Sequence, residues 1–154
     1  MTHQDVNAEL NNLLDRTVTA IQDMGWNSVI LVLRDEINQT TYPAAIATTH
    51  DDLVNLLKNA QPVPFRQNEW RNEKYRISRS YFADHRLHQG EIFNGDGALG
   101  VYRLNLGARN DNEWQSDDFL ITLLRTEDNE FGWISVDDPE DHQRPTLEKI
   151  QVLE

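Results

Sequence analysis

The sequence predicts an α+β domain with an antiparallel sheet, because helical and extended patterns alternate and the extended segments are joined mainly by short polar loops. The chain has 154 residues, with 14 Lys and Arg against 26 Asp and Glu, which gives a formal charge of −12. This length favours a single domain, and the 38% of apolar residues suffices for one core. We therefore expect one domain over residues 1–154, with no internal repeat.

Three segments carry the apolar spacing of amphipathic helices, in which residues three or four positions apart are apolar. The first covers residues 5–24, the second covers residues 50–60, and the third follows Thr146, which is its expected N-cap. Asp51 or Asp52 is the expected cap of the second helix. We expect the apolar residues of the two terminal helices to share one layer, and these residues are Leu10, Leu14, Val18, Ile21, Ile150 and Leu153.

Strand patterns lie between these helices. Residues 26–34 are apolar on both faces, which indicates a central strand buried on both sides. Pro43 places the following strand toward an edge or at a strand start. Two later apolar runs are joined by a five-residue polar loop, 126–130, which predicts a hairpin. The expected strands are residues 26–34, 41–49, 75–82, 119–125 and 131–136, with 99–104 as a further candidate.

The composition removes several classes of function. The sequence has no Cys, which excludes disulfides, thiolate metal sites and thiol catalysis. The acidic balance argues against nucleic acid as a partner, because phosphate contacts need clustered Lys and Arg. The longest apolar run, 29–33, is far shorter than the ~20 residues that cross a bilayer, so no membrane contact is expected. We expect a soluble cytoplasmic protein.

Two tracts resemble parts of a known family. They are YRISRSYF at residues 75–82 and the stretch from Asp117 onward, which includes GWISVDDP at residues 132–139. Both resemble GAF domains of bacterial sensor kinases and related signalling proteins, and with the leading helix and first hairpin the resemblance covers nearly the whole chain. It implies a central antiparallel sheet of about six strands, with the terminal helices on one face and a loop-covered pocket on the other.

Departures from this family narrow the choice of ligand. Without Cys, the chain cannot attach a bilin or act as a methionine sulfoxide reductase, as some similar proteins do. None of its five Phe has the Asp-Glu pair of the cyclic-nucleotide signature at the required offset. In similar proteins the last helix continues into another domain, whereas this sequence ends at Glu154, so we expect a domain excised from a longer signalling protein.

The resemblance places the pocket near Phe82, under the loops between Phe82 and Trp114. This region supplies apolar walls and a few polar groups, which a small-molecule site needs. Arg79 and Arg86 add positive charge, which favours a neutral or anionic ligand. The candidate ligand-binding residues are Ser80, Tyr81, Phe82, His85, Phe93 and Trp114.

Two clusters raise the question of a metal. In the first, His85 and His88 have the i, i+3 spacing that puts two imidazoles on one helix face, with Asp84 and Glu91 nearby. The second is an acidic run that lacks the ligand pattern of an EF-hand, and its members are Asp137, Asp138, Glu140 and Asp141. We interpret the histidines as solvated or hydrogen-bonded, and the acidic run as a turn at Asp138 followed by acids near the start of the last helix. No metal or cofactor is expected.

The predicted function is that of a small-molecule-sensing regulatory domain of bacterial signal transduction, as the resemblance implies. Its partners are then an unidentified small molecule, a second copy bound through the terminal helices, and an adjacent signalling output domain. The alternative is a degenerate GAF domain that dimerises without a ligand. A partly polar, enclosed cavity favours the sensor, whereas a space filled by side chains favours the dimerisation module. An enzyme is not expected, because the sequence offers no assembled set of acid, base, nucleophile and metal ligands.

Overall fold

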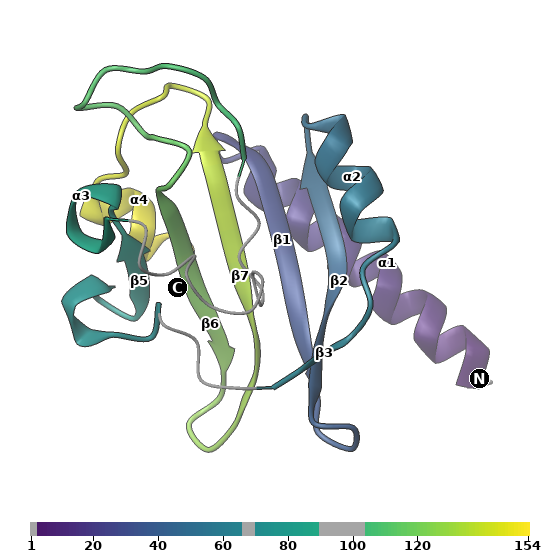
Figure 1. Cartoon of the computed structure of the whole chain (residues 1–154). Coiled ribbons are helices and arrows are strands. Elements are labelled where there is room, and N and C mark those ends of the chain that lie inside the picture. Colours follow the sequence, from purple (N-terminus) through teal and green to yellow (C-terminus); the bar gives the residue numbers. More distant parts are fainter. Residues whose placement is uncertain (1–2, 66–69, 90–103) are drawn as a thin grey trace.

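The computed structural model describes residues 3–65, 70–89 and 104–154. Within these residues, seven strands form one sheet in the order β3-β2-β1-β7-β6-β5-β4, and every neighbouring pair is antiparallel (Figure 1). The strands are β1 (Trp26–Asp35), β2 (Thr40–Thr48), β3 (Val63–Pro64), β4 (Arg76–Ile77), β5 (Ser80–Ala83), β6 (Phe119–Arg125) and β7 (Glu130–Pro139). The helices are α1 (His3–Gln22), α2 (Asp51–Lys58), α3 (His85–His88) and α4 (Leu147–Gln151), with a 3-10 turn at Glu73–Tyr75.

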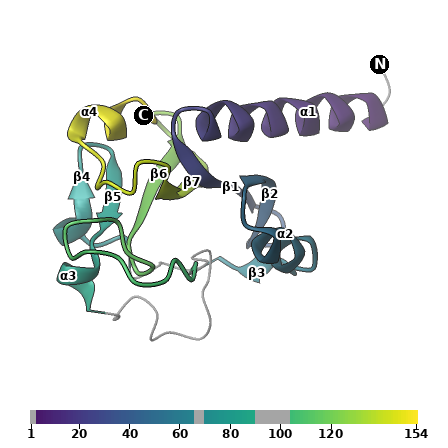
Figure 2. The same ribbon diagram turned by 90° about the horizontal axis from the view of Figure 1, so that it is seen from above.

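The helices lie in two layers on opposite faces of the sheet. The terminal helices α1 and α4 lie on one face, and α2 and α3 lie on the other (Figure 2). Each face has its own hydrophobic cluster, one including Val18 and Ile150, the other including Leu53 and Leu57 of α2. The predicted α+β class and the shared face of the terminal helices are therefore confirmed. The sheet exceeds the expected six strands because two-residue strands, β3 and β4, pair at its edges.

Strand β1 is buried on both faces, as its apolar run predicts. Val29 and Leu31 belong to the cluster under α1 and α4, and Ile30 and Val32 belong to the opposite cluster. The alternation follows from the period of two of a strand. The pairing of β1 with β2 slips by one residue beside Pro43, which has no N–H to donate and is tolerated at such a bulge.

The tract 75–82 is not the single strand that its alternation predicts. Ile77 pairs with Ser80, so the chain reverses through Ser78 and Arg79 and forms two short antiparallel strands. Ser78 takes a φ of +55°, in the left-handed region that glycine usually supplies. Because the turn has no Gly, the sequence gives little sign of it. The candidate strand 99–104 lies almost entirely outside the described residues.

The hairpin of β6 and β7 is confirmed, but its ends differ from the prediction. Arg125 pairs with Glu130, so the loop is residues 126–129 rather than 126–130. Strand β7 continues to Pro139, which pairs with Trp26, so the turn expected at Asp138 is wrong. Asp138 nevertheless has a φ of +51°, a conformation that Asp tolerates better than most residues.

The helix caps are partly as predicted. Thr146 caps α4, its Oγ1 accepting a hydrogen bond from the Lys149 backbone N–H at 3.2 Å. The N-cap of α2 is His50 rather than Asp51 or Asp52, and both aspartates lie in the first turn, where they complement the helix dipole. No described helix is long and apolar enough to span a membrane.

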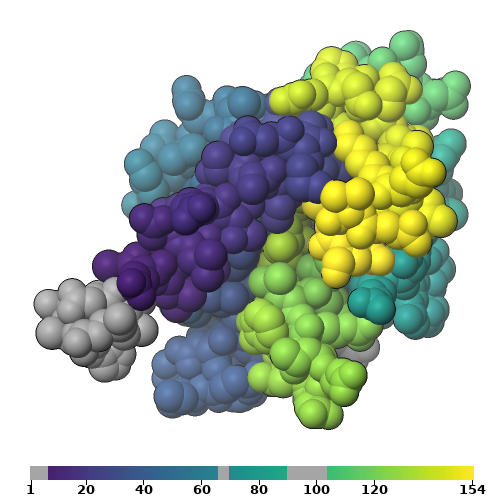
Figure 3. Space-filling view, turned by 180° about the vertical axis from the view of Figure 1, so that it is seen from behind, coloured from purple at the N-terminus to yellow at the C-terminus, as the bar shows by residue number. Residues whose placement is uncertain are grey.

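The layer of the terminal helices is only partly the one predicted. Val18 and Ile150 are buried in it, and three further predicted members pack against it: Leu14, Ile21 and Leu153. Leu10 is 46% exposed, because the N-terminal part of α1 projects beyond the sheet (Figures 2 and 3). The apolar stripe of α1 is therefore longer than the surface that covers it.

The two apolar residues of α4 provide a matched test of this layer. Ile150 is 1% exposed and Leu147 is 54% exposed. We expect Ile150→Ala to lower the free energy of unfolding by about 2–5 kcal/mol, because it removes packed atoms and leaves a cavity. Leu147→Ala should change it by less than about 0.5 kcal/mol. Urea unfolding followed by tryptophan fluorescence measures both, and equal effects would contradict this packing.

Candidate functional site

Asp137 and Asp138, at the end of β7, are the centre of a buried polar network. The Asp137 carboxylate accepts hydrogen bonds from the Trp114 Nε1–H at 2.8 Å and from the Asp138 backbone N–H at 2.7 Å. Burial raises the pKa of Asp137 well above its ordinary value, although these two hydrogen bonds act in the opposite direction. The negative charge of Asp138 adds to the rise. Asp137 is thus a carboxyl group that folding favours in its protonated form.

The pKa of Asp138 is shifted in the opposite direction to that of Asp137. Its carboxylate accepts hydrogen bonds from Arg109 Nη2 at 2.7 Å and Asn27 Nδ2 at 3.2 Å, and it lies 2.9 Å from His50 Nε2. Burial alone would raise the pKa of Asp138, but the hydrogen bonds and the Arg109 charge outweigh it and lower the pKa. The Asp138 side chain therefore connects β7 with β1, with the start of α2 and with the segment that follows residue 104.

Trp114 connects this network to the packed layer under the terminal helices. Its ring stacks on Phe82, with centroids 5.5 Å apart and an interplanar angle of 16°. It also meets Trp26 edge to face at 5.6 Å. Trp114 and Trp26 are completely buried and Phe82 is 9% exposed, so these rings fill the space that they share.

The six residues predicted to bind a ligand do not converge on one cavity within the described residues. Phe82 and Trp114 meet as packed core, and Ser80 lies on the same side of β5, its Oγ 2.8 Å from Thr122 Oγ1. Tyr81 lies on the other face, against Trp70 at 5.6 Å, because successive residues of a strand point to opposite faces.

The remaining two predicted residues are His85 and Phe93. His85 lies in α3, its Nδ1 2.9 Å from Asp118 Oδ1, and Phe93 lies outside the described residues. His88 is buried, and its Nε2 lies 2.7 Å from the Asp117 carbonyl oxygen. The two histidines of the predicted pair therefore have separate partners and do not form a joint site.

Asp84, His85 and Asp118 bring possible ligand atoms within 4.8 Å of one another. Two guanidinium groups lie beside them, because Arg86 and Arg144 both form ion pairs with Asp84. Arg144 Nη2 also lies 3.1 Å from His85 Nδ1. Burial would raise the pKa of Asp84, but hydrogen bonds from Arg86 and Arg144 lower it well below its usual value. These residues fit an ion-pair network better than a metal centre.

A hollow of about 470 Å³ lies beside α2 and borders the Asp138 network through His50. It combines apolar and polar walls, and its lining residues are Thr49, His50, Asp51, Asp52, Leu53, Leu56, Leu104 and Asn105. His50 and Arg109 were not among the residues predicted to form a site. A lone histidine before a helix and a lone arginine in a polar segment gave no signal, because their shared partner, Asp138, is distant in the sequence.

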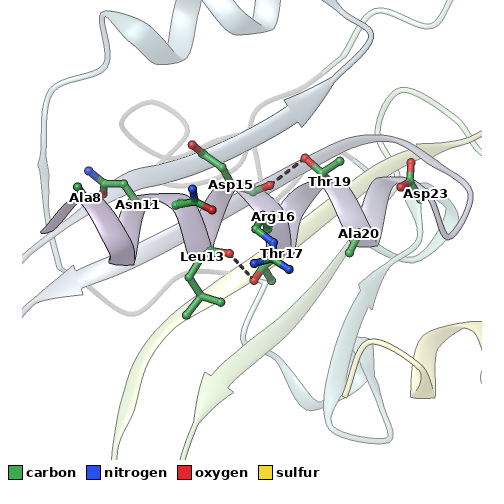
Figure 4. A pocket seen from close by; sticks show the side chains of 10 residues that line it. Ala8, Asn11, Leu13, Asp15, Arg16, Thr17, Thr19, Ala20 and Asp23 are labelled. Atoms are coloured by element: carbon green, nitrogen blue, oxygen red, sulfur yellow. Dashed lines mark hydrogen bonds between the residues drawn. The ribbon is translucent and has the colours of Figure 1, made fainter. Parts of the chain in front are cut away.

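A larger depression, of about 840 Å³, is lined by residues of α1 and by Asp23, which follows its last residue (Figure 4). Thr17 and Thr19 on this helix donate their hydroxyls to the carbonyls of Leu13 and Asp15, both at 2.8 Å. A surface formed by one exposed helix lacks the enclosing walls that a small-molecule site needs. A third hollow, of about 560 Å³ beside Glu154, is lined almost entirely by polar and charged residues. We therefore regard the hollow beside α2, which combines apolar and polar walls, as the candidate site.

The buried Asp137 predicts a specific dependence of stability on pH. Folding raises the pKa of Asp137, so the protonated side chain contributes fully to stability when the pH is below 3.8, its pKa in the unfolded chain. That contribution is lost as the pH rises through the pKa of Asp137 in the folded protein. Asp137→Asn keeps a side-chain oxygen to accept both hydrogen bonds and has no such loss. We expect this variant to gain stability relative to the parent as pH rises from about 4 to about 8 in urea unfolding. Asp128→Asn, at an exposed position, is the control. If the difference in stability between Asp137→Asn and the parent does not change with pH, Asp137 does not have a raised pKa.

Comparisons with known proteins were made at the level of sequence and of structure. No family model matches the sequence, and no curated protein does. Solved structures share the fold across almost the whole chain.

The GAF domain/HD domain protein from Geobacter sulfurreducens has a TM-score of 0.60 at 6% identity, with 99% of this chain and 89% of that chain covered. The GAF domain of an Acinetobacter phosphoenolpyruvate-protein phosphotransferase has a TM-score of 0.59 at 14% identity, covering 99% and 88%. The GAF domain of the corresponding Coxiella burnetii protein has a TM-score of 0.57 at 14% identity, covering 94% and 76%. The antiparallel sheet and the placement of the terminal helices that the sequence resemblance implies are therefore confirmed, and the chain has the fold of a GAF domain. The loop-covered pocket is not among the features that these comparisons show.

Proposed function

We propose that this chain is a regulatory domain that binds a small molecule in the hollow beside α2 and passes the bound state through its terminal helices to an adjacent signalling output domain. The observation that carries the proposal is the position of His50. This side chain lines the hollow and also lies 2.9 Å from the Asp138 carboxylate. A molecule that contacts His50 therefore acts directly on the polar network at the end of the sheet.

The chemistry of the hollow limits the ligand. Its volume of about 470 Å³ lies within the range of roughly 300–1,000 Å³ typical of small-molecule sites. Asp51 and Asp52 contribute negative charge, whereas Arg79 and Arg86 do not line it. The hollow therefore favours a neutral or cationic ligand, and not the neutral or anionic ligand that Arg79 and Arg86 indicated in the sequence.

A short path joins the hollow to α1. Asp138 accepts a hydrogen bond from Asn27, near the start of β1, and the next backbone N–H after β7, that of Glu140, donates to the Gly25 carbonyl at 3.0 Å. Gly25 lies between α1 and β1, with a φ of +104°. A ligand that binds one position of the His50 side chain more tightly than another favours the corresponding position of this end of α1. The size of the shift is set by the difference between the two binding affinities.

The same contacts support a regulatory role rather than a catalytic one. The four buried aspartates of the described residues are held in structural pairs: Asp84 by Arg144, Asp118 by His85, Asp137 by Trp114, and Asp138 by Arg109. A group held in this way is poorly placed to exchange protons with a substrate.

A thermal-shift screen of neutral, cationic and anionic metabolites tests the ligand. A compound at a hundred times its dissociation constant stabilises the fold by about 2.7 kcal/mol, which raises Tm by roughly 5–10 °C. Leu56→Trp should remove the shift, because Leu56 lines the hollow and is 56% exposed, so the larger side chain fits without disrupting the core. Leu87→Trp in α3, also at a position 56% exposed, is the matched control and should leave the shift intact. Equal shifts in both variants would overturn the assignment of the site.

Dimerisation through α1 is a second candidate function, favoured by a separate observation. Leu10 and Leu13 of α1 are 46% and 58% exposed, and Figure 4 shows Leu13 on this helix. An antiparallel pairing centred near Leu13 would place Glu9 opposite Arg16 of the second copy, which supplies complementary charge. The pairing buries apolar side chains that the monomer leaves in water.

Sedimentation equilibrium tests this pairing. We expect the parent to be a dimer and Leu13→Asp to be a folded monomer, because position 13 is exposed in the single chain. Its urea stability should equal that of the parent diluted until the dimer has dissociated. Leu147→Asp, at another exposed leucine, should remain a dimer. A monomeric parent at every concentration would rule out the dimerisation function and leave the ligand proposal standing.

A further inference from the structure

The turn between β4 and β5 needs a partner outside itself. Its two central residues are Ser78 and Arg79, and Ser78 has a φ of +55°. This conformation costs a serine more than a glycine. In a two-residue hairpin turn, the N–H of the second residue points away from the ladder, so the N–H of Arg79 has no partner within the turn.

Glu154 supplies the missing acceptor. One of its carboxylate oxygens accepts the Arg79 N–H at 2.7 Å and the Ser80 hydroxyl at 2.9 Å, and the other accepts the Ser78 hydroxyl at 2.7 Å. Burial opposes the charged form of Glu154, but these hydrogen bonds and the Arg79 charge outweigh it and lower the pKa of Glu154. One carboxylate thus binds three consecutive residues of the turn.

The contact continues into the sheet. Ser80 is completely buried, and its hydroxyl lies 2.8 Å from the Thr122 hydroxyl on β6. Leu153 and Ile77 pack against the same hydrophobic cluster, so an apolar contact region adjoins the polar contact. Figure 3 shows the C-terminal segment (yellow) lying against the hairpin region (teal).

Other charges surround the carboxylate. A hollow of about 560 Å³ beside Glu154 is lined by Arg79, Arg125 and Glu127 among others. The two arginines favour the charged carboxylate and Glu127 opposes it, so the local balance holds Glu154 as an anion.

We propose that Glu154 is a latch that couples the segment after α4 to the β4–β5 edge of the sheet. With the carboxylate in place the turn is ordered. When the segment after α4 moves away, the turn loses three hydrogen bonds at once and the short edge strands loosen. By reciprocity, loosening of the turn releases the segment after α4. This device goes beyond the proposed ligand function and does not depend on it.

Amide hydrogen exchange of the full chain tests the latch. We expect Glu154→Gln to accelerate exchange of the Arg79 amide and of the β4–β5 ladder by about tenfold, since hydrogen bonds to a charged group contribute more than neutral ones. Exchange in β1 should not change. Glu148→Gln, at an exposed position at the start of α4, is the control for loss of a nearby charge. It should leave amide exchange in the β4–β5 turn unchanged. Equal exchange in the parent and in Glu154→Gln would overturn the proposal.

Two further variants separate a latch from a local contact. Ser78→Ala removes one donor in the turn, and a latch requires it to accelerate exchange of the Leu153 amide, which donates to the Ile150 carbonyl at the end of α4. Ser78→Gly combined with Glu154→Gln should recover part of the lost protection in the turn, because glycine adopts the positive φ without strain. Unchanged exchange at Leu153 in Ser78→Ala would show that the contact serves the turn alone and would overturn the coupling.

Discussion

The adjacent acidic side chains of Asp137 and Asp138, buried at the end of β7, are the constraint on which this end of the molecule depends. Burying a polar or charged group without partners is costly, so donors must be brought to both side chains from elsewhere in the chain. Trp114, Arg109 and His50 are three of these donors, and none lies in the sheet itself. The segment that follows residue 104 and the start of α2 are therefore positioned by the need to satisfy one strand end. The hollow between them is a consequence of that arrangement.

The four tryptophans show how the same sheet organises two different cores. All four are at most 1% exposed. Trp26 and Trp114 meet under the terminal helices, and Trp70 and Trp133 meet on the opposite face at 5.7 Å. The space around Phe82 is occupied by the first pair, which is why a cavity expected there is not found among the described residues. The proposed site lies instead at the start of α2, where His50 and Asp52 adjoin Leu56.

The fold could be predicted where a single local pattern determines it. The apolar run of β1 and the cap at Thr146 are of this kind, and both are confirmed. The site could not be predicted, because its members meet only through tertiary contacts. His50 and Asp138 are 88 positions apart, and the acidic run gave no sign that Asp138 would continue a strand rather than end it. The turn at Ser78 was missed for the same reason, since its acceptor is 76 positions away.

The position of α4 follows from these distant contacts more than from helix propensity. A helix of five residues has almost no stability of its own, because nucleation is costly and few hydrogen bonds repay it. What holds it is the burial of Ile150, the Lys149 ammonium 4.7 Å from the Trp26 ring, and the Glu154 carboxylate at the β4–β5 turn. Trp26 begins β1, an inner strand of the sheet, and the β4–β5 turn lies at the sheet's edge, so α4 and the segment after it contact both. An element held by such contacts depends on each of them, which is the dependence that the proposed latch at Glu154 uses.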